Sequence, residues 1–238
     1  MIRKIMSKIC QWLKWPCEMI ELSRENNWAF IFNNTIADSC WLRNKSFSPG
    51  RWASNYSFLY ILYRVLNDVK PQAIIEFGLG QTTRMIVQYG KSFNVNPLTI
   101  EHDERWSNYF CQATELSGEG LIVHLDLEER YYKGFKTTAY SGLQDVAENK
   151  KYDLIVLDGP FASDRFSRIQ ILDLIPDHLA DSFCIIIDDF DRRGEKDTVK
   201  EVKRILAERK INFVCGYYAG TKAQQLICSP DWGFLTGL

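Results

Sequence analysis

The chain has 238 residues, of which 46% are hydrophobic and 25% charged, and its formal net charge is −1. This length and apolar content are sufficient for one large α/β domain with a full core. The charge balance argues against a nucleic-acid partner, because such binding depends on a surplus of Lys and Arg. The seven cysteines show neither CxxC pairs nor metal-ligand spacing, which is typical of reduced thiols, so we expect a cytoplasmic protein.

The first segment, residues 1–15, places apolar side chains at helical spacing before Pro16. This pattern predicts an amphipathic helix that ends at the proline. Its lysines and tryptophans are compatible with peripheral contact with a membrane surface, and the alternative, which we favour, is docking on its own domain or on a second subunit of a homodimer. No apolar run reaches the roughly 20 residues that span a bilayer, so we expect no transmembrane segment.

The next part of the chain leads into the main domain. Residues 22–50 show no clear periodicity and are predicted to be irregular. An apolar stripe then predicts a helix over residues 52–67, which ends before a proline. We therefore expect residues 1–71 to form a helical N-terminal extension, acting as a substrate lid or dimer contact, and residues 72–238 to form the main domain.

From residue 72 onward, apolar runs alternate with amphipathic segments. Strands that alternate with helices imply right-handed crossovers and a parallel sheet covered on both faces. Residues 211–220 and 222–230 are two strand-like runs with no helix between them, so the last strand is expected to be antiparallel. The other predicted strands are 72–77, 97–101, 121–125, 152–157 and 183–188, and the predicted helices are 81–90, 104–116, 141–148, 165–179 and 195–209.

The stretch "AIIEFGLGQTTRMI" contains a glycine turn between a strand and a helix. Gly78 and Gly80 stand where backbone N–H groups can approach a ligand, although an ordinary tight turn is the alternative. Glu76 precedes the turn and favours an ammonium group of the ligand over a pyrophosphate. Glu101 ends the next strand, where a carboxylate can accept both hydroxyls of a ribose. An amino-acid end, a ribose and no phosphate describe S-adenosyl-L-methionine (SAM).

"IIEFGLGQTT" resembles motif I of class I SAM-dependent methyltransferases, and "LTIEHD" resembles their motif II. The resemblance extends from residue 72 to the last residue. It implies an α/β fold with a doubly wound, seven-stranded, mostly parallel sheet, an antiparallel last strand, and helices on both faces. It also implies these cofactor-binding residues: Glu76, Gly78 and Gly80 at the methionine end, Glu101 at the ribose, and Thr82 and Asp158.

Carboxylates also end the fourth and fifth strands, in "YDLIVLDGPF" and "FCIIIDDFD". Because parallel strands end at one edge of a sheet, Asp158, Asp188 and Asp189 are expected in one cleft. Three carboxylates repel each other unless protons or a cation intervene, and oxygen ligands suit Mg²⁺ or another divalent cation. The trio resembles the metal set of catechol-type O-methyltransferases, with Asp189 in place of Asn. The resemblance implies catalytic roles for Asp158 and Asp188 through a metal that orients a substrate hydroxyl, and capping without metal is the alternative.

Candidate substrate contacts lie in two further segments. Arg165 and Arg168 are predicted on one side of a helix, where Arg165 could bind an acidic substrate, and ordinary ion pairs are the alternative that we favour. Small-molecule methyltransferases often cover the active site with an N-terminal helix. The resemblance thus makes Trp52, Asn55 and Tyr56 candidate substrate contacts, with core or dimer packing as an equal alternative.

The sequence therefore predicts a SAM-dependent methyltransferase that acts on a hydroxyl of a small-molecule or sugar-like acceptor, with or without a divalent metal. A catalytically silent SAM-binding interaction module is the alternative of another class. A nicotinamide oxidoreductase is a third hypothesis, which Glu76 disfavours because phosphate groups would lie close to its carboxylate.

Overall fold

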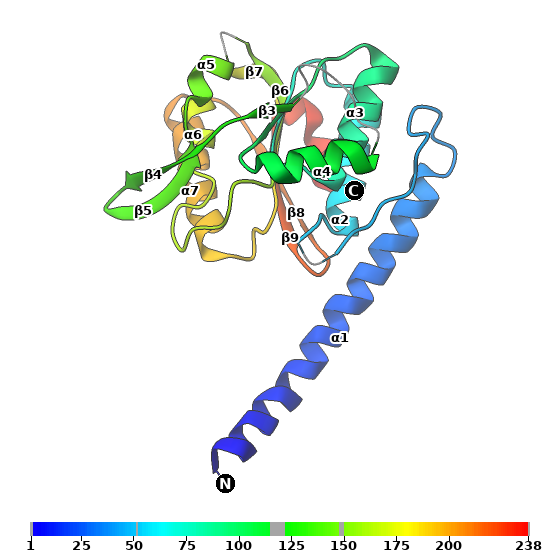
Figure 1. The fold of residues 1–238 in the computed structure, drawn as a ribbon, viewed down its shortest axis with the longest axis vertical. Coiled ribbons are helices and arrows are strands. Elements are labelled where there is room, and N and C mark those ends of the chain that lie inside the picture. Colours follow the sequence, from blue (N-terminus) through cyan, green and yellow to red (C-terminus); the bar gives the residue numbers. More distant parts are fainter. Residues whose placement is uncertain (1, 51, 115–121, 148–149, 238) are drawn as a thin grey trace.

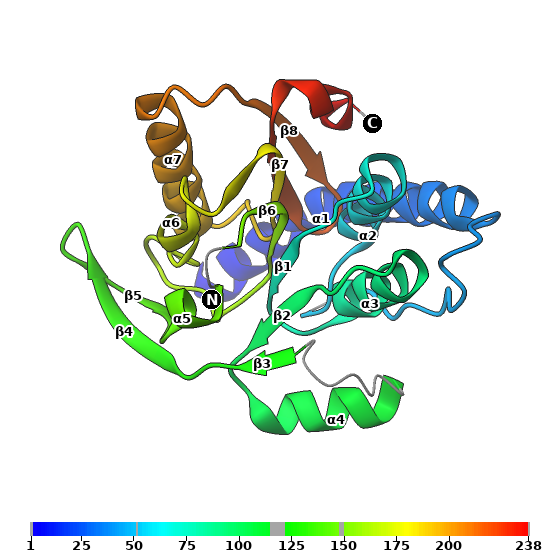
Figure 2. The ribbon, with the colours of Figure 1, turned by 90° about the horizontal axis from the view of Figure 1, so that it is seen from above.

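A seven-stranded sheet organises this computed structural model, which describes residues 2–50, 52–114, 122–147 and 150–237. The strand order is β3-β2-β1-β6-β7-β9-β8. The first five strands of this order pair in parallel, and β9 is antiparallel to both β7 and β8 (Figures 1 and 2). The predicted fold class is therefore confirmed. The strands are β1 Ile74–Phe77, β2 Leu98–Glu101, β3 Ile122–His124, β6 Tyr152–Leu157, β7 Leu179–Ile187, β8 Val214–Ala219 and β9 Ala223–Cys228.

Helices cover both faces of this sheet, with α1, α2 and α3 on one side and α5, α6 and α7 on the other (Figure 2). Successive residues of a strand point to opposite faces. In β6, Leu154 and Val156 accordingly pack into the first core and Ile155 and Leu157 into the second. The helices are α1 Ile2–Ile36, α2 Tyr56–Arg64 with a π-helical continuation Val65–Val69, α3 Gln81–Phe93, α4 Glu104–Thr114, α5 Leu143–Ala147, α6 Ile171–Leu174, α7 Arg193–Glu208 and the 3₁₀ helix Pro230–Thr236.

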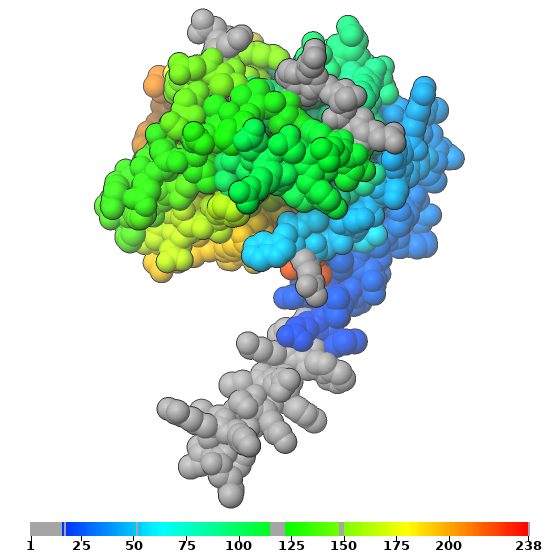
Figure 3. Space-filling view, viewed as in Figure 1, coloured from blue at the N-terminus to red at the C-terminus, as the bar shows by residue number. Residues whose placement is uncertain are grey.

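Helix α1 is much longer than predicted, because it continues through Pro16 and ends at Ile36. The predicted end at the proline is wrong, and the segment predicted to be irregular, 22–50, is helical up to residue 36 and irregular only over 37–50. Trp28, Phe32 and Ile36 recur every four residues and pack into the first core, and this packing stabilises the helix that a proline only interrupts locally. In Figure 3 the blue part of α1 lies against the lower right side of the domain.

Several predicted features fall where the structure gives no description. The amphipathic character predicted for residues 1–15 concerns side chains outside the described ones, and only the helical backbone is described there. The predicted element ends at residues 116, 121 and 148 also lie outside the described residues. Within the described ranges, no helix combines the length and the apolar character that crossing a membrane requires.

A separate two-stranded antiparallel sheet, β4 Leu127–Tyr132 and β5 Phe135–Tyr140, was not predicted. Its strands are joined by Lys133 and Gly134, which both have positive φ, at 49° and 80°. A two-residue loop with this backbone is typical of a hairpin, because its twist matches that of the strands. The Lys-Gly pair between two alternating runs is the sequence signal for this hairpin.

The predicted helix over residues 165–179 is wrong, since only the four residues of α6 are helical. Phe166 and Arg168 have positive φ values of 50° and 58°, which a helix does not allow. The backbone leaves the helical path there because Arg168 turns inward to the ends of β6 and β7, where it forms ion pairs. Pro176 then prevents a longer helix before β7.

Candidate functional site

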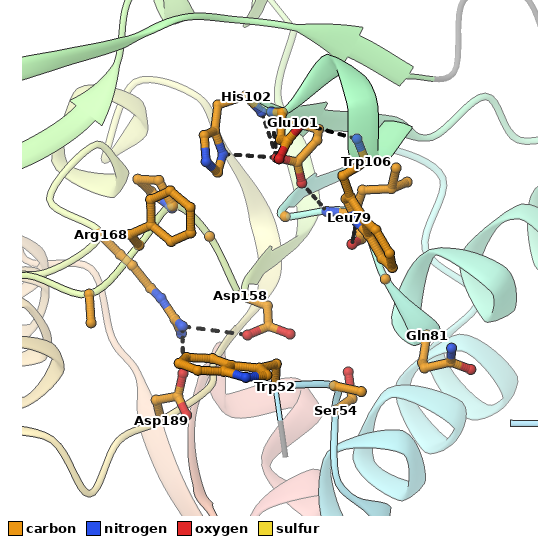
Figure 4. A pocket seen from close by; sticks show the side chains of 18 of the residues that line it. Trp52, Ser54, Leu79, Gln81, Glu101, His102, Trp106, Asp158, Arg168 and Asp189 are labelled. Carbon is orange, nitrogen blue, oxygen red and sulfur yellow. Dashed lines mark hydrogen bonds and ion pairs between the residues drawn. The ribbon is translucent and has the colours of Figure 1, made fainter. Parts of the chain in front are cut away.

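A cavity of about 790 Å³ lies at the carboxyl ends of the parallel strands. Its wall includes the glycine turn after β1 and the turns after β2, β6 and β7, together with the segment that precedes α2 (Figure 4). Open parallel sheets bind ligands at this edge, because strand ends and helix starts present free backbone groups there. The structure brings six predicted site residues to the cavity wall: Trp52, Gly78, Gly80, Glu101, Asp158 and Asp189.

The two glycines of the turn have different structural roles. Gly78 has a φ of +94°, and a Cβ built on it would lie 2.9 Å from the carbonyl carbon of Asp158. Gly80 has a Cβ position with nothing within 4 Å, and its N–H donates to Thr83 Oγ1 over 2.9 Å. Gly78 thus allows two strand-end turns to pack closely, whereas Gly80 leaves open space beside the cavity.

We expect Gly78→Ala to lower the free energy of unfolding by at least about 2 kcal/mol, because positive φ and backbone overlap both oppose a side chain. Gly80→Ala is the matched control, with an expected change below about 1 kcal/mol because its Cβ meets open space. Urea denaturation of both variants measures the difference. Equal losses at the two positions would contradict these separate roles.

Glu101 is held rigidly at the end of β2. Its Oε2 accepts from Leu79 N over 2.9 Å, and its Oε1 accepts from the backbone N–H groups of His102 and Asp103 over 2.7 and 2.9 Å. Burial alone would raise the pKa of Glu101, but the His102 ring and these backbone donors outweigh it, so the pKa is lowered. The carboxylate is therefore ionised at the cavity wall and links the β2 turn to the glycine turn.

Glu76 lies beneath the glycine turn rather than in the cavity wall. It is fully buried, and its Oε2 accepts from the hydroxyls of Thr83 and Thr99 over 2.8 and 2.9 Å. Its Oε1 has no hydrogen-bond partner among the described residues. Burial raises the pKa of Glu76 to about 7, although the hydroxyls of Thr82, Thr83 and Thr99 lower it in part. The buried Thr82 belongs to the first turn of α3.

Asp158, Asp188 and Asp189 lie together, with one oxygen of each within 4.8 Å of the others. Two largely buried cationic side chains bind this carboxylate trio. Arg168 Nη2 lies 2.7 Å from Asp189 Oδ2 and 3.4 Å from Asp158 Oδ1, and Lys222 Nζ lies 2.6 Å from Asp188 Oδ2 (Figure 4 draws the Arg168 pairs). The clustering of the trio follows from the shared sheet edge, whereas neither cation was assigned to it from the sequence.

The charged groups in this cluster shift one another's pKa values. Burial and the neighbouring Asp188 raise the pKa of Asp158 well above its usual range. Burial also opposes ionisation of Asp188, but Lys222 and Arg168 lower its pKa below the usual value. Asp188 is therefore an ionised carboxylate bound to a lysine ammonium, and Asp158, which faces the cavity, holds its proton more tightly.

The structure places one candidate substrate contact in the cavity wall and the other three outside it. Helix α2 begins at Tyr56, four residues later than predicted, and Asn55 caps it by accepting from Phe58 N. Trp52 stands before the helix in the cavity wall with 91% of its surface exposed. Asn55, Tyr56 and Arg165 do not line the cavity.

Tyr56 and Arg165 instead contact other side chains of the domain. Tyr56 packs against Phe32 of α1, with 6.0 Å between ring centroids. Arg165 forms an ion pair with Asp197 and lies 4.2 Å over the Phe135 ring. The ion-pair alternative is thus what the structure shows for both arginines, with partners other than those nearest in sequence.

The strand order, the antiparallel β9 between β7 and β8, and a cavity beside the glycine turn after β1 define the class I SAM-dependent methyltransferase fold. Among solved structures, a Staphylococcus aureus protein provisionally designated a caffeoyl-CoA O-methyltransferase has this fold, with a TM-score of 0.53 and 13% identity over 85% of this chain and 99% of that one.

Two further solved structures resemble the chain. An O-methyltransferase from Bacillus cereus in complex with S-adenosylhomocysteine has a TM-score of 0.49 and 14% identity over 87% of this chain and 91% of that one. A methyltransferase from Podospora anserina bound to the same compound has a TM-score of 0.49 and 11% identity over 82% and 94% of the two chains. No protein-family model and no curated protein sequence matches the chain.

Proposed function

We propose that the protein is a SAM-dependent methyltransferase that acts on a hydroxyl group of a small-molecule or sugar-like acceptor. The observation that carries this proposal is the arrangement of three features, two in the wall of one cavity and one beneath its glycine turn. Gly80 leaves an open position in the turn after β1, and Glu101 presents an ionised carboxylate at the end of β2. Glu76 of β1 is buried beneath the turn, and β1 and β2 are neighbours in the sheet. Together they suit a ligand with an amino-acid end and a ribose but no phosphate.

The residues present fit the cofactor on structural grounds. The buried Oε1 of Glu76 has no described partner, and an ammonium group would satisfy it, since an orphaned buried acceptor is costly. Glu101 would accept from the ribose hydroxyls. When bound, SAM supplies an electrophilic methyl group on its sulfonium. The chain's own contribution is then to orient the acceptor oxygen and exclude water, because a direct displacement needs no enzyme nucleophile.

The cavity also offers surfaces for an acceptor. Trp52, Phe161 and Arg192 line it, and 91% and 70% of the surfaces of Trp52 and Phe161 are exposed. Aromatic faces beside a few polar groups are typical of small-molecule sites. Trp52 comes from the segment before residue 72, so we propose that this N-terminal part supplies the cover of the acceptor site.

Isothermal titration calorimetry with S-adenosylhomocysteine, with and without Mg²⁺ and with NADH as comparison, tests the proposal. We expect the homocysteine compound to bind and NADH not to bind. An acceptor screen then separates an enzyme from a silent binding module, which would bind the cofactor without turnover. Absence of binding under both metal conditions would remove the methyltransferase assignment, and NADH binding would favour an oxidoreductase.

Glu101→Ala is expected to weaken this binding at least tenfold, which is about 1.4 kcal/mol. Asp153→Ala is a matched control, because Asp153 also accepts two backbone N–H groups, those of Gln72 and Ala73, but at the amino end of its strand. The control should keep the wild-type affinity. Undiminished affinity of the Glu101 variant, or equal losses in both, would contradict the ribose role.

A further inference from the structure

The carboxylate trio does not fit a divalent cation as the chain folds, because cationic side chains already bind each of its members. Arg168 contacts Asp158 and Asp189, Lys222 contacts Asp188, and Arg192 Nη1 lies 2.9 Å from Asp189 Oδ2. Three positive side chains thus lie within 4 Å of three carboxylates. A divalent ion among them would meet repulsion from all three, and at least one oxygen of each carboxylate already faces a cationic side chain.

Lys222 has the position most like that of a bound ion. Its Nζ lies 2.6 Å from Asp188 Oδ2 and 3.8 Å from Asp189 Oδ1, so it stands between two members of the trio. Its side chain is 14% exposed, and the residue lines the cavity together with Asp158. The ammonium is therefore held by the carboxylates on one side and faces the cavity on the other.

The turn that carries Lys222, between β8 and β9, is fixed by distant parts of the chain. The Lys222 carbonyl accepts from Gly220 N and from Asn55 Nδ2 over 2.9 and 3.1 Å. Glu25 of α1 accepts from Thr221 N over 2.8 Å and from Asn55 Nδ2 over 3.1 Å. A turn held by α1 and by the cap of α2 places the ammonium at the carboxylates without rearrangement.

The second oxygen of Asp188 is also committed within the chain. Its Oδ1 accepts from Gln224 Nε2 over 2.8 Å, and Gln224 in turn accepts from Ser57 Oγ over 2.6 Å. Gln224 Nε2 donates to Asn55 Oδ1 as well, over 2.8 Å. Asp188 thus uses one oxygen for a lysine and the other for an amide, and this leaves no free oxygen toward a metal ion.

We propose that the ammonium group of Lys222 takes the place of a divalent cation at Asp188 and Asp189, so that the acceptor oxygen meets an N–H donor instead of a metal ion. The part that concerns the acceptor rests on the proposed methyltransferase function. An ammonium has three N–H donors, so one can bind an acceptor oxygen while others bind the trio. When the acceptor hydroxyl releases its proton to solvent, a hydrogen bond from Lys222 stabilises the oxyanion that remains until its oxygen forms the bond to the methyl group.

Titration of the full-length protein with Mn²⁺, followed by the loss of the free-ion electron paramagnetic resonance signal, tests this assignment. We expect no fall of the free-ion signal through binding at the trio of the wild type. We expect Lys222→Met to bind Mn²⁺ at least tenfold more tightly than the wild type. Adding Asp188→Asn to that variant should abolish the gain. Lys136→Met is the control, because it removes an exposed lysine paired with Glu129 far from the trio.

Each outcome decides the assignment. Mn²⁺ binding by the wild type that Asp188→Asn abolishes would overturn it, and so would a folded Lys222→Met variant without any gain. Mn²⁺ binding that persists when Asp188→Asn is introduced lies at another site, and this outcome supports Lys222 as the cation of the trio. If Lys222→Met does not fold, the wild-type titration alone decides between metal and lysine.

A titration with S-adenosylhomocysteine on the same wild-type sample keeps the two proposals apart. Binding of that compound together with Mn²⁺ at the trio leaves the methyltransferase proposal standing and removes the lysine assignment. The absence of both kinds of binding removes the methyltransferase proposal and keeps Lys222 as the cation of the cluster, without a role toward an acceptor.

Discussion

Replacement of Arg168 by methionine is expected to lower the free energy of unfolding by about 3–5 kcal/mol. The guanidinium is 3% exposed, pairs with Asp158 and Asp189, and donates to the carbonyl oxygens of Leu157 and Asp188 over 3.0 and 2.8 Å. Without it, buried carboxylates and two carbonyls lose their partner, while the packing volume is roughly kept. Urea denaturation near neutral pH measures the loss.

Arg165→Met is the matched control, because that arginine pairs with Asp197 and is 22% exposed. A partly exposed ion pair contributes about 1 kcal/mol or less. The loss in Arg168→Met should also shrink toward about pH 5, since carboxylates that lack their cation bind protons more tightly in the folded state. Equal effects of the two substitutions, or a deficit that does not depend on pH, would contradict the role of Arg168 as the charge partner of the cluster.

Glu76→Gln is expected to make the protein more stable at about pH 8 and to remove a pH dependence of its stability. Burial raises the pKa of Glu76 from 4.5 to about 7, so the folded state binds a proton that the unfolded state releases. This stabilisation is complete below pH 4.5 and is lost as the pH rises through about 7. The full difference corresponds to roughly 3 kcal/mol, which a neutral amide would regain at alkaline pH.

Denaturation curves at several pH values for wild type and variant measure this effect. Glu101→Gln is the control with the opposite sign, because the pKa of Glu101 is lowered and its loss should destabilise the protein at neutral pH. The Glu76 variant should nevertheless bind S-adenosylhomocysteine more weakly, if the carboxylate holds an ammonium group. A variant that gains stability and loses affinity would show that burial of this acid serves binding, and unchanged stability at alkaline pH would contradict the buried charge.

The sequence was sufficient for the sheet because its signals are local. Apolar runs predicted all seven strands of the main sheet, and the missing helix between β8 and β9 predicted the antiparallel end. The joint position of Asp158, Asp188 and Asp189 was predictable as well, since parallel strands end at one edge. These conclusions need only the spacing of apolar residues along the chain and the direction of each strand.

The cations of the site could not be predicted in the same way. Arg168 stands in a run with a helical period, and only the buried carboxylates explain why the backbone leaves the helix there. Lys222 occupies a short turn that has no pattern of its own, and its partner Asp188 is 34 residues away. At such positions, contacts with charged groups far away in the sequence override the local backbone preference. These contacts follow no repeating spacing that a single sequence could reveal.

The clamp of Glu25 on Thr221 joins residues 196 positions apart, and Trp28 donates to the Ala219 carbonyl across 191. During synthesis, α1 leaves the ribosome long before the turn that it holds has been made. Contacts of such long sequence separation form late and slowly. The lysine that binds the carboxylates therefore reaches its place only after the β8–β9 turn has emerged, and until then a nascent domain contains the glycine turn and an incomplete cavity wall.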